Sequence, residues 1–166
     1  MDFLLSANTD VGIVKATNQD SLTIKLINSR QGKIVLAVLC DGMGGLSKGE
    51  VASASVINAF DRWSKTELPK LCDEGITDSV IRTHWEQIIS EENNLIMSYG
   101  KTNGVRLGTT VVAMLLTQDR YYILNVGDSR AYEITNELKQ ITFDQTFVAR
   151  EIALGNMTEA EAEKDS

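Results

Sequence analysis

Hydrophobic and polar residues alternate in the first part of the chain as they do in β-strands. Over residues 21–28 an apolar side chain recurs at every second position, and residues 34–40 form an almost unbroken apolar run. The polar residues 29–32 between them favour a turn. We therefore expect a hairpin whose second strand ends at Asp41, preceded by a short strand at residues 3–5.

The pattern then changes to apolar residues at every third or fourth position, which is typical of amphipathic helices. The first predicted helix begins at Ser47, whose hydroxyl would form a capping box with Glu50, and the second covers residues 77–98. Strands are predicted again at residues 109–116, 120–126 and 130–134, followed by a helical segment at 147–154. This order predicts an α+β fold in which helices pack on an antiparallel sheet or sandwich.

Composition indicates one globular domain and excludes several classes of function. The chain has 166 residues, 43% of them hydrophobic, and a single Pro, so we expect one domain over residues 1–166. Its net charge of −7 disfavours nucleic acid as a partner. The longest apolar run is too short to cross a bilayer and no signal-peptide pattern precedes it, so we expect a cytoplasmic protein without a membrane partner. Cys40 and Cys72 are too far apart in sequence for a metal motif and are expected to be buried thiols.

Four short segments hold the candidate chemistry: Asn-Gln-Asp at 18–20, Asp-Gly-Met-Gly-Gly at 41–45, Gly-Thr-Thr at 108–110 and Gly-Asp-Ser-Arg at 127–130. Asp41 follows an apolar run and precedes a glycine turn, which presents its carboxylate at a strand end. Mg²⁺ and Mn²⁺ prefer oxygen ligands, and one carboxylate can bridge two such ions about 3.5–4 Å apart. Taken alone, the pentapeptide is equally compatible with a flexible turn, and the Gly-Thr-Thr segment with simple β-propensity.

In this order and at this spacing, the four segments resemble the metal-dependent protein serine/threonine phosphatases of the type 2C (PPM) family. The resemblance implies an antiparallel β-sandwich flanked by helices. It also implies that Asp41 bridges two Mn²⁺ or Mg²⁺ ions, with further metal ligands from Asp20, the Gly42 carbonyl and, at a weaker site, Asp128. Lys15 stands where the family has an arginine that binds the substrate phosphate.

The chain departs from the family pattern at several positions. Met43 replaces the histidine of eukaryotic members, which favours the bacterial branch, while Gln19 replaces an acid and Gln145 a histidine. The resemblance runs from about Asp10 to the end of the chain and stops before the family's last motifs. Two later aspartates of the family have no counterpart, so we expect the domain to be incomplete at its C-terminus, without its final strands.

The implied function is hydrolysis of phosphoserine and phosphothreonine in proteins by a water molecule that two metal ions activate. Asp41 and Lys15 are the predicted catalytic residues, and the partners would be phosphoprotein substrates of a serine/threonine kinase. Two alternatives stay open: a non-catalytic module that binds a phosphoprotein or another partner, and a structural domain without metal. The single histidine, His84, lies in the middle of a predicted helix and is given no role.

Overall fold

A computed structural model of the protein describes residues 2–30, 32–44 and 48–158. The elements in chain order are β1 Asp20–Ser29, β2 Gly32–Met43, α1 Gly49–Thr66, α2 Leu68–Glu74, α3 Asp78–Asn103, β3 Gly108–Thr109, β4 Val111–Leu116, β5 Tyr121–Val126, β6 Tyr132–Ile134, β7 Leu138–Gln140 and α4 Phe147–Ala153. This arrangement confirms the α+β class with antiparallel sheets and flanking helices.

The central feature is an antiparallel sheet in the order β1-β2-β4-β5, with the short β3 paired to the end of β2. The predicted hairpin is confirmed, because β1 and β2 pair along their whole length, from Ser29 opposite Gly32 to Asp20 opposite Asp41. β2 continues beyond Asp41 to Met43, since β3 extends the pairing there. The β1–β2 register therefore brings two acidic residues together at one end of the sheet.

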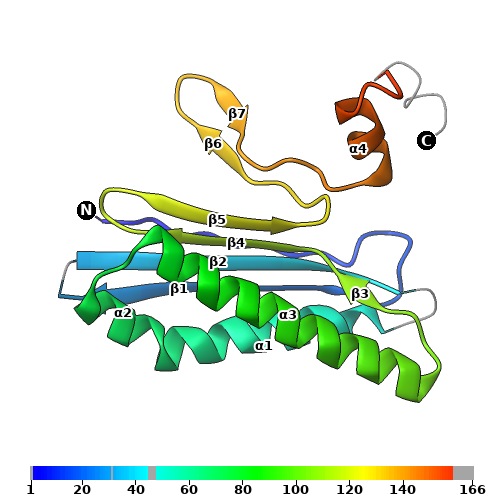
Figure 1. The fold of residues 1–166 in the computed structure, drawn as a ribbon, viewed down its shortest axis with the longest axis horizontal. Coiled ribbons are helices and arrows are strands. Elements are labelled where there is room, and N and C mark those ends of the chain that lie inside the picture. The colour runs from blue at the N-terminus through cyan, green and yellow to red at the C-terminus, as the bar shows by residue number, and fades with distance from the viewer. Residues whose placement is uncertain (1, 31, 45–47, 159–166) are drawn as a thin grey trace.

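Helices α1 and α3 cover one face of this sheet, the lower side in Figure 1. Their apolar sides meet alternate residues of the strands, among them Leu36 and Leu115, whose side chains are fully buried. Phe60 of α1 and Trp85 of α3 pack edge to face with ring centroids 5.8 Å apart. None of the described helices is long and apolar enough to cross a membrane. The main hydrophobic core thus lies between the sheet and the helices.

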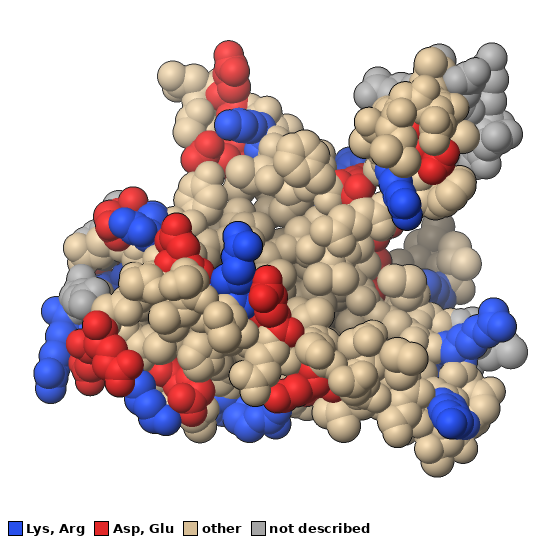
Figure 2. Space-filling view, in the orientation of Figure 1, with Lys and Arg blue, Asp and Glu red and all other residues tan. Residues whose placement is uncertain are grey.

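The opposite face of the sheet is also apolar but is covered only in part. Successive cross-strand rows on that face are Leu22–Leu39–Val112, Ile24–Ala37–Met114–Ile123 and Leu26–Val35–Leu116–Tyr121. Residues 6–8 and the β6–β7 hairpin border a groove of about 380 Å³ over the first two of these rows. Figure 1 shows the hairpin and α4 standing above the sheet, and Figure 2 shows charged side chains concentrated along the helical layer and the hairpin, with few between them.

Several local predictions need correction. Residues 3–5 are not part of a strand, because none of the described residues 2–17 forms a ladder with a neighbour. Neither α2 nor β7 was predicted, and α3 continues to Asn103, where Gly104 in the left-handed conformation (φ 64°) ends it. The predicted strand over 109–116 is interrupted at Thr110, which lies between β3 and β4.

The start of α1 also differs from the prediction. Ser47 lies outside the described residues, and the helix begins at Gly49 with Lys48 in the N-cap position and no side-chain cap. One carboxylate oxygen of Glu50 is buried and finds no hydrogen-bond partner among the described residues, and the predicted capping box, which involves Ser47, lies outside the described residues. The N-terminus of α1 is fixed by packing against the end of β2, as described next, rather than by a side-chain cap.

Candidate metal and phosphate site

The candidate site lies where β1 begins and β2 ends, at the right-hand end of the sheet in Figure 1. Asp20 and Asp41 are directly opposed across the hairpin, and both are exposed. The buried Gln19 anchors this end, because its carbonyl accepts hydrogen bonds from the Gly42 N–H at 3.1 Å and the Ser53 hydroxyl at 2.7 Å. These hydrogen bonds join the start of β1, the end of β2 and the first turns of α1 next to the two carboxylates.

Two glycines let the strand and the helix approach this closely. A Cβ on Gly42 would lie 2.3 Å from the carbonyl oxygen of Gly49 and 2.4 Å from that of Gln19. A Cβ on Gly49 would lie 2.7 Å from the carbonyl carbon of Gly42. Any larger residue at either position would force the backbones apart. The close approach of Gly42 to Gly49 thus brings the N-terminus of α1 to the site.

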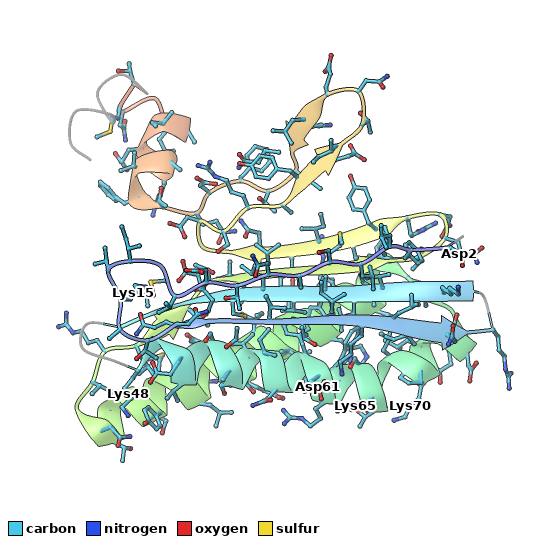
Figure 3. The ribbon with its side chains drawn as sticks, turned by 180° about the vertical axis from the view of Figure 1, so that it is seen from behind. Asp2, Lys15, Lys48, Asp61, Lys65 and Lys70 are labelled. Carbon is cyan, nitrogen blue, oxygen red and sulfur yellow. The ribbon has the colours of Figure 1, made fainter. Side chains whose placement is uncertain are left out.

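The charges at this end act on the Asp41 carboxyl. Although Asp41 is partly open to solvent, desolvation by its surroundings raises its pKa above the ordinary value, and the neighbouring Asp20 carboxylate raises that pKa further. Lys15 has the opposite effect on the Asp41 pKa, and Asp128 adds a smaller upward contribution. Figure 3 shows Lys15 at this end of the sheet. The structure therefore brings Lys15, Asp20 and Asp128 into electrostatic range of the Asp41 carboxyl.

Asp128 lies on a turn after β5 that is held from two sides. Gly127 adopts a φ of 101°, and the Gln145 amide group bonds both the Asn125 carbonyl, at 3.0 Å, and the Gly127 N–H, at 3.4 Å. Gln145, which stands where the family has histidine, is thus a structural clamp on this turn. Two residues after Asp128, Arg130 forms an ion pair with Asp144 at 2.6 Å.

The donor set at the site suits a hard divalent cation. Adjacent carboxylates whose mutual repulsion raises a pKa gain most from a cation placed between them. Among the four charged residues of the site, Asp20 and Asp41 are the pair that face each other directly. Within the described residues no group of three or more His, Cys, Asp or Glu side chains is arranged to hold a metal ion. The described part of the chain thus places two acids side by side and a third, Asp128, further away.

The hydroxyl groups that lie behind the acids were not predicted from the sequence to be part of the site. Thr110 is 2% exposed, and its Oγ1 accepts a hydrogen bond from the Asp41 N–H at 3.0 Å. The same oxygen lies 2.7 Å from Ser129 Oγ. In the sequence these hydroxyl groups were indicated only by a threonine of a buried strand in one segment and by a serine next to the acid in another. His84, by contrast, packs near Trp63, with ring centroids 6.3 Å apart, away from the site.

The chain matches the family model for protein phosphatase 2C over residues 13–164. It is 31% identical over 160 residues to a serine/threonine phosphatase, stp, of Listeria innocua, covering 93% of this chain and 59% of that protein. It is 35% identical over 163 residues to the serine/threonine protein phosphatase PstP of Mycobacterium tuberculosis, covering 95% of this chain and 28% of that protein. The chain therefore spans about three fifths of the length of the stp phosphatase.

Solved structures give the same result. A serine/threonine phosphatase of S. agalactiae is 30% identical, with a TM-score of 0.76, over 94% of this chain and 62% of the other. The catalytic domain of PstP in complex with two manganese ions is 32% identical, with a TM-score of 0.69, over 93% of this chain and 61% of the other. The similarity thus covers nearly all of this chain and the larger part of each phosphatase domain.

Proposed function

The chain belongs to the protein phosphatase 2C family, and from that premise we propose that it carries the acidic metal site and the phosphate-binding lysine of a serine/threonine phosphatase domain. The observation that carries the proposal is the register of β1 and β2. This register places Asp20 directly opposite Asp41, at the end of the sheet where Lys15 also lies. The PstP structure with two manganese ions supports Mn²⁺ or Mg²⁺ as the cations.

The proposed roles follow from the chemistry of each group. Asp20, Asp41 and the Gly42 carbonyl hold the cations, and Asp128 serves a peripheral one. When bound, Mn²⁺ or Mg²⁺ provides a nucleophilic water at neutral pH and neutralises charge on the phosphoryl group. Lys15 attracts the phosphate as a point charge, without the paired donors of an arginine. The substrates proposed are phosphoserine and phosphothreonine in proteins phosphorylated by a serine/threonine kinase.

Calorimetric titration with Mn²⁺ tests the metal site. We expect Asp41→Asn, which removes one charge and keeps the side-chain shape, to weaken Mn²⁺ binding by more than about ten-fold. Asp73→Asn is the matched control, because Asp73 is an exposed acid paired with Arg30 at 3.6 Å on α2, remote from Asp41. Equal Mn²⁺ affinity in wild type and Asp41→Asn would contradict the site.

A second candidate function is a module that binds phosphoprotein without hydrolysing it. The observation in its favour is that the described residues bring only two carboxylates into direct proximity, which is fewer than two fully occupied cation sites require. Turnover of a phosphothreonine peptide in Mn²⁺ separates the two candidates. Metal-dependent release of phosphate that Asp41→Asn abolishes favours the enzyme, whereas Mn²⁺-dependent peptide binding without release favours the module.

A further inference from the structure

Thr110 connects the two strand ends that present Asp41 and Asp128, although these acids lie far apart in the sequence. Its backbone N–H donates to the Asp41 carbonyl at 2.9 Å, and its Oγ1 accepts from the Asp41 N–H at 3.0 Å. Both peptide groups that flank the Asp41 Cα are therefore bonded to this one residue. The neighbouring Thr109 hydroxyl also donates to the Asp41 carbonyl, at 3.1 Å.

The same side chain contacts the residues on both sides of Asp128. Its Oγ1 lies 2.7 Å from Ser129 Oγ, and its methyl group fills the space beside Gly127, where an added Cβ would lie 2.8 Å from Thr110 Cγ2. Gly127 needs a positive φ of 101° as well, so this contact and the backbone both require glycine there. The methyl group therefore packs against one neighbour of Asp128, while the hydroxyl bonds the other.

Because Thr110 is 2% exposed, no water competes for its hydroxyl. A buried hydroxyl bonded to two groups fixes their separation more firmly than an exposed one, since losing either bond leaves a polar group unsatisfied. Residues that orient metal ligands from behind typically change metal affinity 10–100-fold when they are replaced. The position of Thr110 is that of such a residue, between an acid on β2 and an acid after β5.

We propose that the buried hydroxyl of Thr110 is a positioning group that sets the distance between Asp41 and Asp128, and through it the affinity of the acidic site for a divalent cation. The effect of Thr110 on cation affinity rests on the proposed function, whereas the coupling of the two strand ends through Thr110 does not. Thr110 is not a catalytic residue, because it acts only through the backbone of Asp41 and through Ser129.

The test compares three variants of the full chain. Thr110→Val keeps the methyl contact with Gly127 and removes the hydroxyl, whereas Thr110→Ser keeps the hydroxyl. Thr142→Val is the matched control, since Thr142 is 5% exposed and its Oγ1 likewise accepts from a backbone N–H, that of Ala131, at 3.0 Å. Mn²⁺ affinity is measured by calorimetry, and protection of single amides by hydrogen exchange.

We expect Thr110→Val to weaken Mn²⁺ binding at least about ten-fold, with Thr110→Ser and Thr142→Val within about three-fold of wild type. The Asp41 amide should exchange at least about ten-fold faster in Thr110→Val but not in Thr110→Ser or Thr142→Val, because only Thr110→Val removes its acceptor, while the amide at position 110 keeps its bond to the Asp41 carbonyl. Unchanged Mn²⁺ affinity in Thr110→Val, or an equal loss in Thr142→Val, would overturn the proposal.

Hydrogen exchange keeps the two proposals separable. If the wild-type chain binds no Mn²⁺, the proposed function fails and with it the role of Thr110 in cation affinity. The coupling of the strand ends is then decided by exchange alone, with Ser129→Ala added as a fourth variant: faster exchange of the Asp41 amide in both Thr110→Val and Ser129→Ala supports it. Exchange of the Asp41 amide that is unchanged in Ser129→Ala overturns the coupling.

Discussion

The two faces of the central sheet have similar side chains and different surroundings. On strand β2, Leu36 points to the helical layer and is fully buried, whereas Leu39, three residues later, points to the other side and is 44% exposed. Each face carries rows of apolar residues across the strands. Only the first face is sealed by long helices, while the second is bordered by residues 6–8 and the β6–β7 hairpin.

This difference between the two faces shows that the sequence pattern alone does not reveal which contacts stabilise the fold. An alternating pattern shows that a strand has an apolar face, and a continuous apolar run shows that it has two. Neither pattern shows which face is covered. In this chain the stabilising contacts are concentrated on the α1–α3 side, and Asp20 and Asp41 lie at one end of the strands of that same sheet.

The largest expected effect comes from truncating the same residue type on each face. Leu36→Ala should lower the free energy of unfolding by about 2–5 kcal/mol, because it leaves a cavity in the sealed core. Leu39→Ala should cost less than about 1 kcal/mol, since much of its side chain already contacts water. Urea unfolding monitored by circular dichroism measures both. Equal losses would mean that the second face is as well covered as the first.

A smaller effect is expected from the ion pair that joins the turn after β5 to the segment after β7, on the less covered side. The Arg130 guanidinium beside Asp144 holds the pKa of that carboxyl below its usual value. The stabilisation is thus present above the ordinary carboxyl pKa of about 4 and is lost as pH falls through the lowered one. Asp144→Asn should lower the unfolding temperature by no more than about 4 °C at pH 7.

Thermal scans of wild type and Asp144→Asn between pH 7 and pH 3 provide the measurement. The difference between the two proteins should shrink as the pH decreases. Asp73→Asn is the control, because its partner Arg30 lies 3.6 Å away and both side chains are largely exposed. A difference for Asp144→Asn that stays constant down to pH 3 would exclude the ionised carboxylate as its cause.

The smallest effect is expected for the thiol on the covered face of the sheet, which should not be modified at all in the native chain. Burial raises the pKa of Cys40 to about 12, so its thiolate is scarce at pH 8 and its sulfur is shielded as well. Ellman's reagent should leave Cys40 unmodified in the native chain and modify it after unfolding. By contrast, Leu39→Cys, one residue away on the open face, should add a rapidly reacting thiol. Rapid native reaction of Cys40 would show that the helical layer opens.

Features that depend on local periodicity and local chemistry could be predicted from the sequence. Alternation and the polar turn identified the β1–β2 hairpin, and three-to-four spacing identified α1 and α3. The acids Asp20, Asp41 and Asp128 could be selected because each stands at a strand end beside residues that form turns. Their roles as metal ligands, and that of Lys15 toward phosphate, stay predictions.

The way in which these local elements meet depends on long-range contacts that the sequence does not reveal. The bond between Asp41 and Thr110 joins residues 69 positions apart, and that between Thr110 and Ser129 joins residues 19 apart. No short-range pattern encodes such distances, because they depend on strand order and on the close approach of Gly42 to Gly49. Which face of the sheet is covered likewise depends on where α1 and α3 pack, since both faces carry apolar residues.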